Sequence, residues 1–139
     1  MGGMMQENRW LELHDSQVES LLIDGRNLVL IFSAAYIHKS PRRPGRDAGT
    51  GWRQRIRLEF KKASLDGKPD KLPDRIDDGE LDLAGKADGG ISLPFSWEKP
   101  VRLSLIFQSG NEIQIYGDRL AVTEMGEADY VENFPGGLA

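Results

Sequence analysis

The residues of this chain whose types could perform chemistry begin with the tripeptide His14-Asp15-Ser16. A histidine, an acid and a serine carry out nucleophilic hydrolysis, but they do so as a spatial arrangement and not as a sequence motif. Neighbouring side chains on an extended chain point to opposite sides, so adjacency argues against a triad. We therefore expect Asp15 or Ser16 to bind backbone N–H groups at a turn before a strand that starts near Val18.

Metal and cofactor chemistry has few candidate residues. The chain has no cysteine, and its two histidines, His14 and His38, are separated by a predicted hairpin, whereas metal sites need converging ligands. The acidic residues between 74 and 82 lack the ligand spacing and closing Glu of an EF-hand loop. The stretch GRDAGTGWR lacks the Lys-Ser/Thr ending of a phosphate-binding loop. The sequence thus predicts no catalytic residue, no metal site and no cofactor.

The strongest candidate for a functional site is a basic segment. Residues 39–62 hold nine of the 18 Lys and Arg and two acidic residues, in a chain of net charge −4. Arginines at alternate positions of a strand lie about 7 Å apart. Their positive charges repel one another unless an anion lies close enough to neutralise them. The anion is a nucleic acid, an acidic partner or the chain's own acidic remainder, and we rank intramolecular pairing first. The candidate binding residues are Arg42, Arg43, Arg46, Arg53, Arg55 and Arg57.

Short apolar runs between turn residues predict the antiparallel strands that would position these side chains. A first hairpin is expected from residues 18–23 and 28–33 around the turn sequence DGRN. The clearest alternation is WRQRIRLEFK at 52–61. It predicts a half-buried strand whose buried face carries Trp52, Ile56, Leu58 and Phe60 and whose other face carries the arginines.

The rest of the chain repeats this pattern. Residues 80–84 and 91–95 predict a second hairpin after a polar loop at 66–78, and alternation at 101–107, 113–115 and 120–122 predicts a C-terminal meander. About eight short strands built from hairpins and a meander indicate a mainly β fold, an antiparallel sandwich or partly open barrel.

The length of 139 residues fits a single β-rich domain, 1–139. Within it we expect a flexible tail at 1–9, a mobile basic loop at 39–51 with almost no apolar residue, and an extended C-terminal tail at 127–139. The first residues lack the charged and apolar regions of a signal peptide, and no window approaches a membrane span. We therefore expect a cytoplasmic protein without membrane association.

The opening stretch WLELHDSQVESLLIDGRNLVLIF, followed by the RIRLEF strand, resembles small bacterial all-β domains in which a Leu-His-Asp-Ser or similar entry precedes a first hairpin. Some of these domains are immunity proteins of bacterial toxin systems, and others have no assigned role. The resemblance covers residues 1–62, and the insertion KSPRRPGRDAGTG departs from the compact pattern. It implies a protein-binding module and supplies no catalytic residue.

These observations favour a non-enzymatic protein-interaction module with an immunity-like role, which binds an unidentified protein through strand edges or its charged surface. The alternative is nucleic-acid or polyanion binding through the six arginines, which ranks lower because the pI is 5.2 and no aromatic residue alternates onto the basic face. Self-association into a homo-oligomer is left open. A hydrolase centred on His14, Asp15 and Ser16 ranks last.

Overall fold

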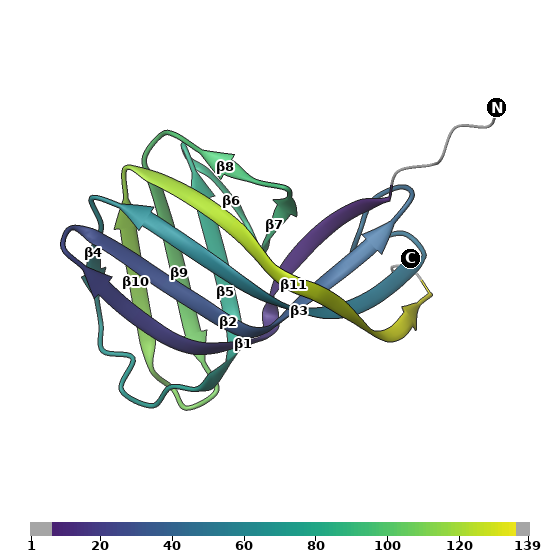
Figure 1. Ribbon diagram of the computed structural model, residues 1–139, viewed down its shortest axis with the longest axis horizontal. Coiled ribbons are helices and arrows are strands. Elements are labelled where there is room, and N and C mark those ends of the chain that lie inside the picture. The colour runs from purple at the N-terminus through teal and green to yellow at the C-terminus, as the bar shows by residue number, and fades with distance from the viewer. Residues whose placement is uncertain (1–6, 136–139) are drawn as a thin grey trace.

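The computed structural model describes residues 7–135, which consist of β-strands and connecting loops without a helix (Figure 1). This confirms the predicted mainly β class. The strands are β1 (Asn8–Asp24), β2 (Asn27–Ser40), β3 (Gly49–Lys61), β4 (Ser64–Asp66), β5 (Asp74–Leu83), β6 (Lys86–Asp88), β7 (Gly90–Leu93), β8 (Ser96–Trp97), β9 (Val101–Phe107), β10 (Glu112–Gly117) and β11 (Arg119–Phe134). Nothing in the described range has the helical length and apolarity needed to cross a membrane.

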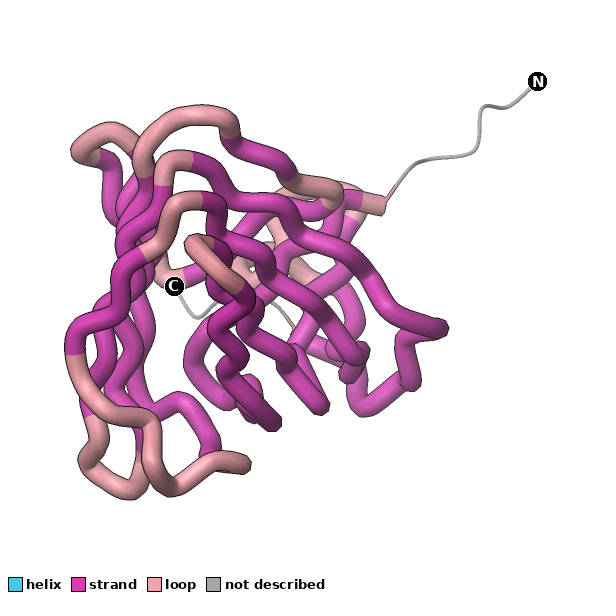
Figure 2. Tube along the Cα trace, turned by 60° about the vertical axis from the view of Figure 1, so that its left-hand side comes forward, coloured by secondary structure: helices cyan, strands magenta, loops and turns pink. Residues whose placement is uncertain are grey.

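The strands form one antiparallel sheet that curls into a half-barrel, as the partly open barrel prediction expected. Neighbouring strands hydrogen-bond in the order β4-β10-β9-β5-β1-β2-β3-β11-β8, with β6 added beside β5 and β7 beside β1. The curl is visible in Figure 1, and the tube trace of Figure 2 shows its strands joined by short loops.

The interior of the half-barrel is an apolar core. Phe32 of β2, Phe60 of β3 and Phe107 of β9 are its largest side chains, each at most 2% exposed. Ile56 and Leu58 of β3 are fully buried beside them, and Trp52 packs against the same core. The period-two burial predicted for residues 52–61 is therefore confirmed.

Four strands continue beyond the half-barrel and form a second region, which we call the arm. The arm consists of residues 8–12 of β1, 36–40 of β2, 49–53 of β3 and 129–134 of β11, together with the loop 41–48. Figure 1 shows these strand ends running out to one side of the half-barrel, which we call the body.

Bulges separate the arm from the body. The β1–β2 register shifts between Glu12 and Gln17, and the β2–β3 register shifts between Phe32 and Ala35. An extra residue in one strand reverses which side chains face the core beyond that point. In β2, Phe32 is buried in the body, whereas Ala35 and Ile37 are the fully buried residues toward the arm.

Several strands pair differently from the sequence prediction. Residues 74–78, predicted as loop, already belong to β5, and its hairpin partner is β6, while β7 pairs with β1. β9 and β10 form the expected hairpin, but the third strand of the predicted meander, β11, pairs with β3 instead. Alternation identifies a strand and its buried face, but it does not identify the partner strand.

The ends of the chain also differ from the prediction. Asn8 and Arg9, expected in a flexible tail, begin β1, and residues 127–134, expected in an extended tail, continue β11 along β3. Residues 1–6 and 136–139 of these predicted tails lie outside the described residues.

Candidate functional site

The six candidate arginines fall into two groups, and the first group lies on β3. Arg55 pairs with Glu19 of β1 at 2.7 Å, and Arg57 lies 3.5 Å from Glu59. The hydrogen bond from Arg55 lowers the pKa of Glu19 below its ordinary value. Arg53 lies on the arm, with its guanidinium 5.7 Å from the centre of the Tyr36 ring. Arg55 and Arg57 therefore form ion pairs with acidic side chains of the chain itself.

The second group lines one pocket of the arm. Arg42, Arg43 and Arg46 come from the loop between β2 and β3, and Arg9 joins them from β1. The pocket has a volume of about 640 Å³, and we call it the Arg pocket. Its other lining residues are Asn8, Trp10, Glu12, Pro44, Gly45, Asp88, Ser92 and Leu93.

The four guanidinium groups of the Arg pocket differ in their partners. Arg9 forms an ion pair with Glu124 of β11, and Arg43 lies 3.2 Å from Asp47. The hydrogen bonds from Arg43 lower the pKa of the Asp47 carboxyl. Arg42 and Arg46 are exposed and have no ion-pair partner among residues 7–135. The Arg pocket thus contains two guanidinium groups, those of Arg42 and Arg46, that form no ion pair within the described chain.

Hydrogen bonds tie the loop 41–48 to the strands beside it. The Asn8 amide donates to the Arg42 carbonyl at 2.6 Å. The Ser40 hydroxyl donates to the Ala48 carbonyl at 2.9 Å and accepts from the Arg42 N–H at 3.1 Å. These bonds connect the loop 41–48 to β1 and β2. The ends of the loop predicted at 39–51, residues 39–40 and 49–51, belong to β2 and β3.

The indole of Trp10 forms an apolar wall of the Arg pocket and lies between two glycines. Gly45 of the loop has a φ of 82°, and a Cβ there would lie 3.0 Å from the indole. A Cβ at Gly90 of β7 would overlap the indole outright. Glycine at both positions therefore lets the loop and β7 approach Trp10 closely.

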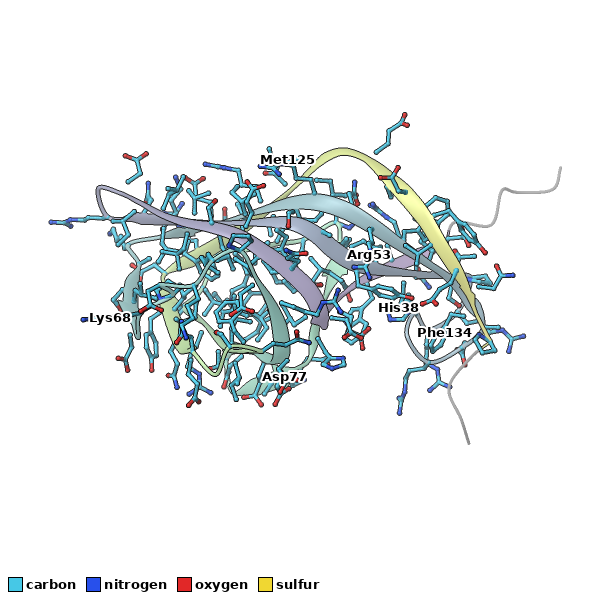
Figure 3. The ribbon with its side chains drawn as sticks, turned by 90° about the horizontal axis from the view of Figure 1, so that it is seen from below. His38, Arg53, Lys68, Asp77, Met125 and Phe134 are labelled. Atoms are coloured by element: carbon cyan, nitrogen blue, oxygen red, sulfur yellow. The ribbon has the colours of Figure 1, made fainter. Side chains whose placement is uncertain are left out.

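Next to the Arg pocket, four side chains far apart in the sequence form a polar cluster, which we call the arm cluster: Glu12, Tyr36, His38 and Glu132. His38 Nε2 lies 2.9 Å from Glu12 Oε2, and the Tyr36 hydroxyl donates to the Glu132 carboxylate. The His38 ring contacts the Tyr36 ring edge-on at 4.8 Å and the Phe134 ring at 4.9 Å between centroids. Figure 3 shows His38, Arg53 and Phe134 together in the arm, away from Lys68 and Asp77 of the body.

The Tyr36 phenol is held in its neutral form. Burial and the neighbouring Glu132 carboxylate raise the pKa of Tyr36 well above its ordinary value. A Cβ at Gly51 would overlap the Tyr36 hydroxyl, so glycine at this position of β3 lets the phenol cross the strand toward Glu132. A neutral phenol with a raised pKa donates a hydrogen bond and does not act as a base near neutral pH.

The arm cluster does not supply the parts of a hydrolytic site. His38 is 5% exposed and is enclosed by aromatic rings, and its Nδ1 has no hydrogen-bond partner within the described chain. No serine, threonine or cysteine is bonded to its imidazole among the described residues. The Glu12–His38 pair is therefore suited to hold strands β1 and β2 together beside the Arg pocket.

The tripeptide His14-Asp15-Ser16 lies in the bulge of β1 rather than before a strand. The Ser16 hydroxyl donates to the Glu12 carbonyl at 2.5 Å and accepts from the Tyr36 N–H at 2.9 Å. Asp15 has a φ of 70°, and the exposed His14 lies 3.2 Å from its carboxylate. The expected side-chain bonding to the backbone is thus made by Ser16, and the three residues do not assemble a triad.

Metal ligands do not converge in the part of the chain that the structure describes, where no group of three or more His, Asp and Glu could hold an ion. His14 lies in the β1 bulge, while His38 is buried in the arm.

Sequence reasoning identified the loop arginines but missed Trp10 and the arm cluster. Glu132 falls in the stretch predicted as a tail, and it is 96 residues away from Tyr36 in the sequence. One signal was present: Tyr36, His38 and Ser40 alternate along β2, which predicts one face with polar groups. Comparison of the chain with protein-family models, curated proteins and solved structures finds no match.

Proposed function

We propose that this chain is a non-enzymatic, cytoplasmic protein-interaction module that binds an acidic segment of a partner protein in the Arg pocket. The observation that carries this proposal is the difference between the two groups of arginines. Arg55 and Arg57 lie against acidic side chains of the same sheet. Arg42 and Arg46, which line the Arg pocket, are exposed and form no ion pair within the described chain.

Guanidinium groups suit this task because their planar, forked donors match the geometry of a carboxylate. The hydrogen bonds of the loop hold the backbone of Arg42 beside the Arg pocket before a partner arrives. A loop whose backbone is already positioned loses less conformational entropy on binding, which favours affinity. The Trp10 wall adds apolar contact for the aliphatic part of a bound Glu or Asp.

An immunity-like role is consistent with this proposal and forms part of it. Such a module holds a toxin protein and needs no chemistry of its own. The resemblance of residues 1–62 to small bacterial all-β domains supports this role, and a toxin gene beside the gene of this chain would support it further.

Nucleic-acid or polyanion binding is the second candidate, because Arg42 and Arg46 could equally contact phosphates. Phosphate binding gains from a row of free cations along the backbone of the nucleic acid. Arg55 and Arg57 are paired with Glu19 and Glu59, so they are not free to contact phosphates. The net charge of −4 also disfavours binding of a polyanion. An acidic protein segment fits one compact pocket better than a long polyanion does.

The test compares the double variant Arg42→Gln/Arg46→Gln with the matched control Arg55→Gln/Arg57→Gln. Both variants remove two positive charges, but the control removes them outside the Arg pocket. Fluorescence anisotropy at low salt measures the binding of a labelled oligo-glutamate peptide and of a single-stranded DNA with the same number of charges. We expect the pocket variant to bind the peptide about tenfold more weakly and the control to change affinity less than about twofold.

Two outcomes would contradict the proposal. Equal losses in the two double variants would mean that the peptide responds to overall charge and not to the Arg pocket. Tighter binding of the DNA than of the peptide would favour the polyanion alternative.

A further inference from the structure

A second pocket shares the Trp10 indole with the Arg pocket. Its volume is about 680 Å³, and Asp88 and Ser92 also line both pockets. We call it the aromatic pocket, because most of its lining is apolar: Trp10, Leu81, Leu83, Ile91, Phe95 and Trp97. The two pockets therefore adjoin one another, and they differ in chemistry.

The aromatic pocket has walls that are fixed by the body. The rings of Phe95 and Trp97 are nearly parallel, with an interplanar angle of 12° and centroids 6.4 Å apart. Both side chains are partly buried and pack against the apolar core, and Trp97 belongs to β8, which pairs with β11. Preformed pockets of this size with mainly apolar lining are the usual sites for large apolar groups.

We infer that the acidic segment bound by the Arg pocket also carries a large apolar side chain, best an aromatic one, which enters the aromatic pocket. This inference rests on the proposed function and specifies the partner: a peptide segment in which an acidic residue is followed or preceded at close spacing by an aromatic residue.

The spacing of an extended peptide fits two adjoining pockets. Alternate side chains of an extended chain project from the same side about 7 Å apart, a distance comparable with the length of an indole. One side chain can thus contact the arginines while the next on that side contacts Phe95 and Trp97. Trp10 would lie between the two, with one pocket on each part of its ring system.

The charges at the two pockets agree with this arrangement. The Arg pocket has four arginines against the acidic Glu12 and Asp88, whereas the aromatic pocket has Lys86 alone against Asp88, which lines both pockets. An uncharged aromatic group gains from burial in the second pocket, and a second acid does not gain there. The two pockets therefore select for an acid and an aromatic in one segment.

The test uses two synthetic peptides in isothermal titration calorimetry with the full chain. Both peptides contain two glutamates. They differ at one position two residues from the nearer glutamate, which is phenylalanine in the first peptide and serine in the second. The variant Ala87→Trp fills the aromatic pocket from an exposed position of β6 without removing any core atom. Ser64→Trp adds the same indole at an exposed position of β4, at the far edge of the sheet, and serves as its control.

We expect the unaltered chain and Ser64→Trp to bind the phenylalanine peptide at least about tenfold more tightly than the serine peptide. Ala87→Trp should remove this preference and retain the affinity for the serine peptide. Arg42→Gln/Arg46→Gln should weaken both peptides.

The outcomes separate the two proposals. Equal binding of both peptides to the unaltered chain would overturn the inference and leave the proposed function standing. If neither peptide binds, the proposed function itself fails. An equal loss of both peptides in Ala87→Trp would contradict a separate apolar subsite.

Discussion

Strands β1, β2, β3 and β11 run through both the body and the arm, but the two regions are held together by different interactions. In the body, the inner faces of β2 and β3 carry Phe32 and Phe60, and burial of apolar surface provides the stability. In the arm, β2 carries Tyr36 and His38, which are also buried but are bonded to the carboxylates of Glu132 and Glu12. One continuous strand therefore carries an apolar core at one end and a buried polar cluster at the other.

The bulges explain how this difference arises within single strands. In β2, the register shift between Phe32 and Ala35 places Tyr36 and His38 on the face opposite to the apolar core. In β1, the shift between Glu12 and Gln17 does the same for Trp10 and Glu12. Bulges are frequent beside functional sites because they redirect side chains.

The largest effect is expected from the body. Phe32→Ala removes a fully buried ring and leaves a cavity, so the free energy of unfolding should fall by about 3–5 kcal/mol. Urea denaturation measures this loss. The affinity for the oligo-glutamate peptide, measured without urea at a temperature where the variant is folded, should change little. A loss below about 1 kcal/mol would contradict the role of the body as the source of stability.

Breaking the arm cluster should cost less. His38→Phe keeps a buried ring but leaves the Glu12 carboxylate without its imidazole partner, which should lower the free energy of unfolding by about 1–3 kcal/mol. Glu12→Gln and the double variant complete a double-mutant cycle measured by denaturation. If the two single losses add to within about 0.5 kcal/mol of the double variant, the pair does not couple β1 to β2.

Sequence and structure agree best along a stretch of strand that no register shift interrupts. In β3 no shift interrupts the alternation of Ile56, Leu58 and Phe60, so its buried face was readable. β1 and β2 contain bulges that no residue pattern predicts, and in β1 the bulge includes Asp15 with a positive φ.

The candidate site was predictable only in its charged part. The density of arginines identified Arg42, Arg43 and Arg46, because clustered charge is visible in composition. The rest of the site depends on strands pairing across long separations: Glu132 reaches Tyr36 only because β11 pairs with β3. Such pairing is a property of the tertiary structure and not of the local sequence.

An alkaline titration of Tyr36 tests whether the arm buries this phenol. The raised pKa of Tyr36 means that the folded arm holds the phenolic proton more tightly than the unfolded chain does. Its contribution to stability is therefore complete below the ordinary tyrosine pKa and is lost as the pH rises above it. Tyrosinate absorbance should show that Tyr36 ionises only above the ordinary tyrosine pKa.

The control for this titration is Tyr36→Phe, which should lack the absorbance change above the ordinary tyrosine pKa. The variant also leaves Glu132 without its phenolic donor, with an expected loss of about 1 kcal/mol in the free energy of unfolding. If the unaltered chain and Tyr36→Phe show the same absorbance change above the ordinary tyrosine pKa, the arm does not bury this phenol.

The smallest effect is expected at the exposed pair on the outer face of β3. Arg55→Gln should leave stability at neutral pH unchanged within the error of a denaturation curve, because exposed ion pairs are screened by solvent. The pKa of Glu19 should return upward to its ordinary value in an NMR titration of its carboxyl carbon. The stability that this pair provides is present above the ordinary glutamate pKa and is lost as the pH falls through the lowered one. A Glu19 pKa that does not move would mean that the pair does not persist in solution.

The most direct test of the division between arm and body is an NMR titration of the labelled chain with the oligo-glutamate peptide, read at every backbone amide. We predict that the perturbed amides cluster at residues 8–12, 42–46 and 88–93, around the Arg pocket. Perturbations spread along 55–61 of β3, or through the body, with residues 42–46 unaffected, would contradict the account.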